Sequence, residues 1–95
     1  MQVIARRTLK QFWDLHPEAE TALKVWYAAV SKAVWSGPAD IRNQFGSADF
    51  VSDNRVNVAG NRYRVVVHVA YRFKRALIKF VGTHAEYDKI DPETV

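Results

Sequence analysis

The sequence predicts one α+β domain, in which a first strand and a helical hairpin pack on one face of an antiparallel sheet. Three observations support this prediction. Apolar residues recur at helical spacing between residues 6 and 35, and they alternate at strand spacing between residues 62 and 82. Glycine and proline separate the two regions. A chain of 95 residues can bury one hydrophobic core, so residues 1–95 are expected to form a single domain.

A short first strand is predicted at residues 1–5, followed by two helices. The apolar residues of segment 6–16 share one helical face, and Pro17 ends this helix because proline cannot continue its hydrogen bonds. Pro17 also suits the first turn of a second helix, whose apolar stripe extends to about Trp35. With so short a connection, the two segments are expected to form a helical hairpin.

Residues 36–38, Ser-Gly-Pro, end the second helix. One more helical turn is predicted at residues 39–45, and a loop is predicted at residues 46–54.

Three strands are then predicted to form a meander. The first covers residues 56–59, the second begins at Arg62, and the third covers residues 76–82. Gly60–Asn61 is typical of a turn between the first two strands, and residues 73–75 form the next turn.

Alternation along the second of these strands separates a core face from a basic face. The core face is predicted to carry Tyr63, Val65, Val67, Val69 and Tyr71. The basic face is predicted to carry Arg62, Arg64, Val66, His68, Ala70 and Arg72, with the small apolar residues as its floor. On the following strand, Ile78 and Phe80 are expected on the core side, and Leu77, Lys79 and Val81 on the other. Arg62, Arg64 and Lys79 are therefore expected to converge.

Half of the basic residues lie in one segment that contains no acidic residue. Segment 54–79 carries Arg55, Arg62, Arg64, Arg72, Lys74, Arg75 and Lys79, and the whole chain has a net charge of +4. Such residues can simply solvate an exposed face, but their mutual repulsion favours an anionic partner. Guanidinium groups bind phosphate oxygens well. We therefore expect this segment, with His68, to bind a polyanion.

Groups that can transfer protons follow the last predicted strand. Thr83 and Glu86 have the spacing of a helix capping box. His84 is the side chain type best matched to acid–base chemistry near neutral pH, and Tyr87 comes three residues later. His68 is a second candidate. The spacing of the three histidines does not fit metal ligation, so no metal site is expected.

The sequence also bears on location. No apolar run approaches the roughly 18 residues of a membrane span, and the chain has no cysteine. These features fit a cytoplasmic protein without disulfides and without a membrane partner.

A family resemblance lies in the two N-terminal helices and in three segments, SGPADI (36–41), GNRYRVVV (60–67) and FVGTHAEYDKI (80–90). In these parts the chain resembles the HigB toxins of bacterial toxin–antitoxin pairs, which belong to the RelE-like superfamily. The resemblance implies an endoribonuclease that cuts mRNA on the ribosome through the RNA 2′-hydroxyl, without metal or cofactor. It also implies a HigA-like antitoxin as partner, and it implies that the polyanion is RNA. The residues expected to bind this RNA are Arg55, Arg62, Arg72, Lys74, Arg75 and His68. By the same resemblance, Arg64, Lys79, His84 and Tyr87 are catalytic, and His84 matches the acid–base histidine of YafQ-type toxins.

Two other functions are alternatives to the nuclease, and the second would use the same basic face. ParE-like members of the superfamily inhibit DNA gyrase without cutting RNA, and a plain RNA- or ribosome-binding module needs no group that transfers protons. His84 near Lys79 and Tyr87 favours the nuclease.

Overall fold

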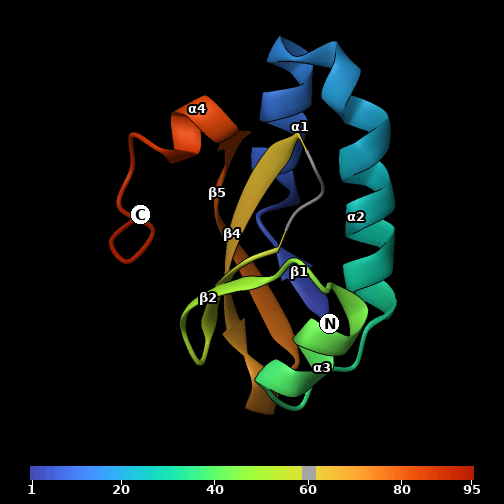
Figure 1. Ribbon diagram of the computed structural model, residues 1–95. Coiled ribbons are helices and arrows are strands. Elements are labelled where there is room, and N and C mark those ends of the chain that lie inside the picture. The colour runs from blue at the N-terminus through green and yellow to red at the C-terminus, as the bar shows by residue number, and fades with distance from the viewer. Residues whose placement is uncertain (59–61) are drawn as a thin grey trace.

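The computed structural model describes residues 1–58 and 62–95, which form one five-stranded sheet with helices against it (Figure 1). In chain order the elements are β1 (Gln2–Ile4), α1 (Arg6–Leu15), the 3-10 turn η1 (Pro17–Ala19), α2 (Glu20–Lys32), α3 (Pro38–Gln44), β2 (Asp49–Ser52), β3 (Arg55–Asn57), β4 (Tyr63–Ala70), the 3-10 turn η2 (Tyr71–Phe73), β5 (Arg75–Thr83) and α4 (His84–Tyr87). The turn predicted at Gly60–Asn61, and Ala59 before it, lie outside the described residues.

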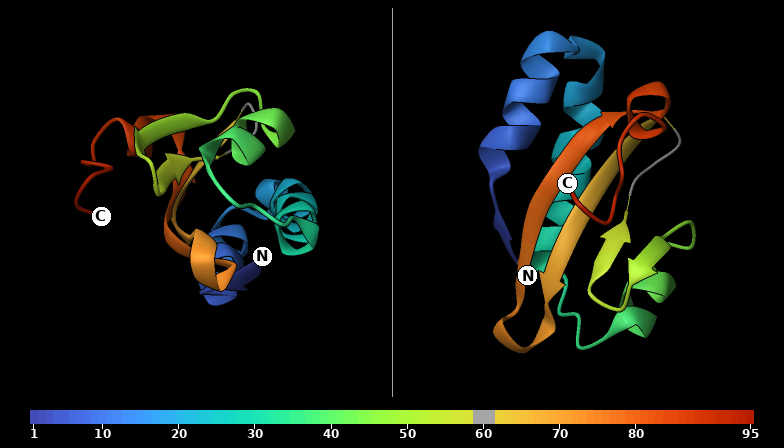
Figure 2. Two further views of the ribbon diagram at one scale, coloured as in Figure 1. Left: turned by 90° about the horizontal axis from the view of Figure 1, so that it is seen from below. Right: turned by 90° about the vertical axis from the view of Figure 1, so that its left-hand side faces the viewer.

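The strand order is β1-β5-β4-β3-β2. Strands β2 to β5 form an antiparallel meander, and β1 pairs in parallel with β5. Helices α1 and α2 lie on one side of the sheet, and the C-terminal segment lies on the other (Figures 1 and 2). The predicted α+β fold, with a first strand and two helices packed on an antiparallel sheet, is confirmed.

The helical hairpin forms as predicted, except at its end. Leu9, Phe12 and Trp13 of α1 are buried against the core, and α2 contributes its own buried stripe. The prediction that α2 extends to Trp35 is wrong, because Ala33 adopts an extended conformation with φ −70° and ψ 151°. Trp35 is instead buried beside α3, where its indole Nε1 donates a hydrogen bond of 2.9 Å to Gln44.

The prediction of a loop over residues 46–54 is wrong, since strand β2 lies within it. Strand β2 is antiparallel to β3 and forms the edge of the sheet opposite β1. Its two apolar residues, Phe50 and Val51, are only partly buried. A strand with so short an apolar pattern gives too few residues for alternation to be recognised.

Strand β5 contains a bulge at Lys79 that reverses its side-chain alternation. Val66 of β4 pairs with Phe80, but the next residue, Val67, pairs with Ile78. Lys79 is therefore an extra residue in β5 without a partner position on β4. Val81 therefore packs against the core, and Phe80 lies on the opposite face with Val66. The predicted placement of Phe80 in the core and of Val81 on the basic face is wrong.

The face opposite the helices is only partly open. Val66 and Asn57 pair across β4 and β3 and are buried on this face, with 0% and 2% of their surface exposed. The C-terminal segment crosses the same side of the sheet (Figure 2), and Arg55 donates hydrogen bonds of 3.1 and 2.9 Å to the backbone oxygens of Pro92 and Val95. The prediction that Val66 floors an exposed surface is therefore wrong.

Candidate functional site

Arg64 on β4 and His84 at the start of α4 are joined by a hydrogen bond across 20 positions of sequence. Nε of Arg64 donates to Nδ1 of His84 over 3.2 Å. The register of the sheet brings them together, because Arg64 pairs with Gly82, two residues before His84. A guanidinium group can only donate, so Nδ1 accepts, and the proton of the neutral imidazole is assigned to Nε2.

Tyr87 completes a cluster around the same guanidinium. The Arg64 guanidinium carbon lies 5.9 Å from the centroid of the Tyr87 ring, within the range of a cation–π interaction. The Tyr87 ring also lies near the ring of Phe80, with 6.4 Å between the two centroids. Phe80 reaches Tyr87 because the bulge places it on this face. We call Arg64, His84 and Tyr87 the Arg64 cluster.

The short helix α4 is fixed at its N-terminus by the predicted capping box, which the structure confirms. The backbone N–H of Thr83 donates to Oε1 of Glu86 over 2.9 Å, and the backbone N–H of Glu86 donates to Oγ1 of Thr83 over 3.2 Å. The bond from the Thr83 backbone is the main reason that the pKa of Glu86 lies below its ordinary value. Glu86 is therefore ionised at neutral pH and serves to position His84 and Tyr87.

Gly82 provides the space that the cluster needs. A Cβ atom at this position would lie 2.5 Å from Cζ of Phe80 and 3.2 Å from Cβ of Glu86. Any side chain at position 82 would therefore push against both the ring that supports Tyr87 and the helix that carries His84.

The other two predicted members of the converging set, Arg62 and Lys79, are exposed. Lys79 lies three residues before Gly82, or about 10 Å along β5. No hydrogen bond or ring contact joins either residue to the Arg64 cluster in the described part of the chain. Their convergence on Arg64 therefore stays a prediction.

The remaining predicted RNA-binding residues lie elsewhere. Arg55 holds the C-terminal segment, and Nε2 of His68 is 3.3 Å from Nδ2 of Asn54. The β4–β5 turn, which holds Arg72, Lys74 and Arg75, lies at the other end of the strands from α4 (Figure 1). Ala70, beside this turn, lies six positions after Arg64 along β4, a distance of about 20 Å.

The chain is similar to a known protein family. The family model described as HigB toxin, RelE-like toxic component of a toxin–antitoxin system, matches residues 19–90. This match covers α2 to α4 and includes the whole Arg64 cluster. The chain belongs to the HigB toxin family. The expected resemblance is thereby confirmed.

Curated relatives of this HigB-family toxin cover nearly its whole length. A protein of Escherichia coli O6:H1 named mRNA interferase HigB is 29% identical over 95% of this chain and 91% of its own length. The mRNA interferase toxin HigB of Escherichia coli K12 and the mRNA interferase HigB of Shigella flexneri are each 30% identical over 93% of this chain and 88% of their own length.

Sequence reasoning missed two contributors to the site of this HigB-family toxin, Phe80 and Gly82. Simple alternation assigns Phe80 to the core, since nothing in the sequence marks the bulge at Lys79. Gly82 precedes the capping box directly, and a glycine at the end of a strand is a signal for close approach of neighbouring groups.

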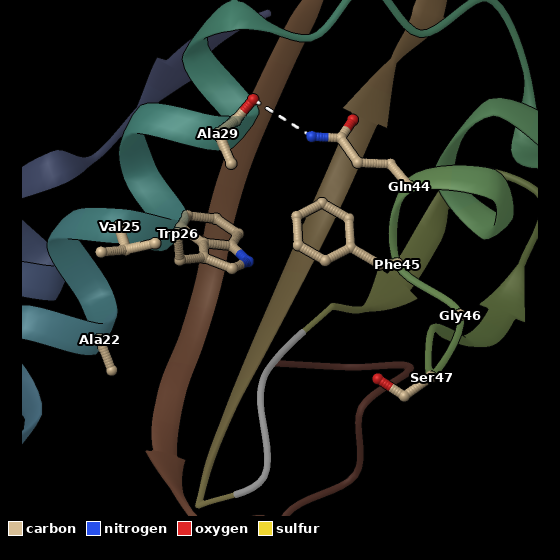
Figure 3. A pocket seen from close by; sticks show the side chains of 8 residues that line it. All are labelled: Ala22, Val25, Trp26, Ala29, Gln44, Phe45, Gly46 and Ser47. Carbon is tan, nitrogen blue, oxygen red and sulfur yellow. Dashed lines mark hydrogen bonds between the residues drawn. The ribbon is translucent and has the colours of Figure 1, made fainter.

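A concave region of the toxin lies between α2 and the end of α3 with the segment that follows it (Figure 3). Its described lining residues are Ala22, Val25, Trp26, Ala29, Gln44, Phe45, Gly46 and Ser47. None of them is acidic, basic or a histidine, so this groove does not offer the acid–base chemistry of the Arg64 cluster. In the part of the chain that the structure describes, no helix is long and apolar enough to cross a membrane.

Proposed function

We propose that this HigB-family toxin is an mRNA interferase, an endoribonuclease that cuts mRNA at the Arg64 cluster. The observation that carries the proposal is the hydrogen bond from Arg64 to His84 beside Tyr87, because it combines a permanent positive charge with a group that transfers protons. The names of the relatives, all mRNA interferases, support the same activity.

Arg64 supplies the charge that the reaction needs. The phosphorus becomes five-coordinate in the transition state, and negative charge builds up on its non-bridging oxygens. The terminal nitrogens of the guanidinium fork bind these oxygens, while Nε keeps its bond to His84. The exposed residues Lys79 and Arg62 add positive charge along the RNA backbone.

His84 and Tyr87 handle the protons. The 2′-oxygen of the RNA forms a bond to phosphorus as the bond to the 5′-oxygen breaks; the 2′-hydroxyl gives up a proton and the 5′-oxygen takes one. Because Nδ1 of His84 accepts the bond from Arg64, His84 exchanges its proton through Nε2. Tyr87 orients Arg64 by its cation–π contact and assists the second transfer. The 2′-hydroxyl acts as nucleophile, so the mechanism needs no metal or cofactor and does not cut DNA.

The finer assignments follow from the same proposal. Residues 1–95 act as one toxin domain in the cytoplasm, on mRNA that is being translated by the ribosome. A toxin of this kind has an antitoxin, and we propose a HigA-like protein as the partner that neutralises it.

The test is induction of the chain in cells with mapping of mRNA 5′ ends, repeated with Arg64→Ala and His84→Ala. New 5′ ends are expected with the wild type and not with either variant. Arg7→Ala, which removes an exposed arginine of α1, is the matched control and should cut like the wild type. A reconstituted translation reaction with and without ribosomes tests the ribosome requirement.

Each rival function predicts a different result. Growth arrest with intact mRNA and inhibited DNA supercoiling would assign a ParE-like gyrase inhibitor. Arrest with intact mRNA and normal supercoiling would assign a plain RNA- or ribosome-binding module. Unchanged cutting by His84→Ala would keep the nuclease and remove His84 from the mechanism.

A further inference from the structure

The turn between β4 and β5 presents an aromatic ring and two arginines to solvent, far from the Arg64 cluster. We call Arg72, Phe73, Lys74 and Arg75 the hairpin tip. The Phe73 side chain is 65% exposed, and the other large apolar side chains that are exposed in the described part of the chain are aliphatic: Ile4, Leu15, Val25 and Val34. Phe73 is thus a flat ring with open surface at a site of high positive charge.

Both arginines of the tip lie against this ring. The guanidinium carbons of Arg72 and Arg75 are 5.8 and 5.9 Å from the centroid of the Phe73 ring. Neither has a carboxylate within ion-pair distance in residues 1–58 and 62–95. The two charges are therefore uncompensated and are held beside the ring by cation–π attraction.

The tip is anchored to the body of the protein. Lys74 adopts a left-handed conformation with φ 54°, and its backbone oxygen accepts a hydrogen bond of 2.7 Å from the N–H of Gln2. Its Nζ donates to the backbone oxygen of Trp35 over 3.1 Å and to the Ser36 hydroxyl over 3.2 Å. Lys74, predicted to bind RNA, thus fixes the turn and orients Phe73.

From this geometry we infer that the hairpin tip is a second nucleic-acid site, which binds an unpaired nucleotide by stacking its base on Phe73 and its neighbouring phosphates on Arg72 and Arg75. A base stacks on an aromatic ring regardless of sequence, and guanidinium groups bind the adjoining phosphates. An acidic peptide would neutralise the arginines but would leave the ring without a stacking partner. A nucleic acid satisfies both.

This inference rests on the proposed function, since it adds a contact for the same substrate class. The tip lies about 20 Å from the Arg64 cluster along β4, so one strand that occupies both sites spans several nucleotides. Stacking and phosphate binding do not read the 2′-hydroxyl. The tip is therefore expected to bind unpaired DNA as well as RNA, although only RNA can be cut.

Uncleavable DNA separates the two proposals. The affinity of the full chain for a fluorescent single-stranded oligodeoxynucleotide is measured by anisotropy at several salt concentrations. Phe73→Ala is expected to raise Kd by on the order of tenfold, and Phe73→Tyr, which keeps the ring, to stay near the wild type. The double variant Arg72→Gln/Arg75→Gln is expected to reduce the slope of log Kd against log salt by about 1.4.

The matched control is Arg7→Gln/Lys32→Gln, which also removes two exposed charges, one from α1 and one at the end of α2. It should keep most of the affinity. Equal loss in this control, or wild-type Kd in Phe73→Ala, would overturn the inference. Thermal unfolding of each variant excludes misfolding. Absence of RNA cutting by the wild type would remove the proposed function and leave this binding result in place.

Two further arms identify the partner. Sedimentation with ribosomes that carry no message tests whether ribosomal RNA is the ligand. If Phe73→Ala no longer sediments with these ribosomes, the tip binds ribosomal RNA. If Phe73→Ala loses affinity only for the free single strand, the tip binds the message. If Arg72→Gln/Arg75→Gln keeps its affinity for both but no longer binds the antitoxin, the tip is a protein-docking surface and the inference is wrong.

Discussion

Arg64 and His84 are held together by a hydrogen bond of 3.2 Å between side chains that belong to different elements, β4 and α4. Helix α4 has only four residues and cannot hold a side chain rigidly by itself. The position of His84 therefore depends on the pairing of β4 with β5, which ends immediately before α4, and on the capping box. Each of these supports can be removed separately.

Arg64→Lys is expected to lower mRNA cutting by about a hundredfold while leaving the unfolding temperature nearly unchanged. Lysine keeps the charge but lacks the planar guanidinium fork. Its single amine cannot replace both the Nε that donates to His84 and the two terminal nitrogens that bind phosphate oxygens. The rate of cutting in a purified translation reaction measures this, with Arg7→Lys as control. Full activity of Arg64→Lys would mean that charge alone is needed.

Thr83→Ala is expected to loosen α4, because it removes the side-chain oxygen that accepts the backbone N–H of Glu86. Loss of an N-cap costs about 1 kcal/mol, and here the loss is confined to the last elements of the chain. Hydrogen exchange of the α4 amides should accelerate while the amides of β4 remain protected. Thr83→Ser keeps the oxygen and should behave like the wild type; if both variants exchange alike, the cap does not hold the helix.

Acid is expected to weaken the same helix through Glu86. The pKa of Glu86 is lowered in the folded state, mainly by the hydrogen bond from the Thr83 backbone, so ionised Glu86 stabilises the fold. That contribution is complete above its ordinary pKa of 4.5 and is lost as the pH falls through the lowered value. It is small, because Glu86 is exposed. Thermal unfolding between neutral pH and pH 3 should show a smaller acid loss in Glu86→Gln than in the wild type, and identical acid losses would refute the role.

The helices and the core strand could be predicted because each has a long periodic pattern. Leu9, Phe12 and Trp13 repeat at helical spacing, and Val65 and Val67 repeat at strand spacing, so burial of one face determines where each element packs. The capping box at Thr83 could also be predicted, since its two hydrogen bonds join residues only three positions apart. These features depend on local sequence.

The faces of β5 could not be predicted, because they depend on pairing between strands. The extra residue at Lys79 exchanges the faces of Phe80 and Val81, and no residue type marks a bulge in advance. The same holds for Arg55, whose partners Pro92 and Val95 lie about 40 positions away in sequence. The basic segment therefore looked like one surface in the sequence, whereas the fold divides it among the Arg64 cluster, the hairpin tip and the C-terminal segment.

Gly82→Ala is expected to impair the cluster without changing any of its members. The new Cβ would approach Cζ of Phe80 at 2.5 Å, so the ring must move, and Tyr87 moves with it. Overpacking of this kind costs about 1–3 kcal/mol. Calorimetry should show reduced stability, and cutting should fall more than in Ala28→Gly on the exposed face of α2, which itself costs about 1 kcal/mol. Wild-type cutting in Gly82→Ala would show that the cluster tolerates displacement of Phe80.

Arg55→Gln is expected to release the C-terminal segment from the sheet. The guanidinium binds the backbone oxygens of Pro92 and Val95, and hydrogen bonds to a charged donor are among the stronger ones in proteins. Their loss should accelerate hydrogen exchange of the Thr94 and Val95 amides, which donate to Asp91, by on the order of tenfold. Arg72→Gln removes an equal charge at the hairpin tip and should leave these amides protected. If the amides exchange at the wild-type rate in Arg55→Gln, other contacts hold the segment, and Arg55 is then available for the RNA binding that its charge predicts.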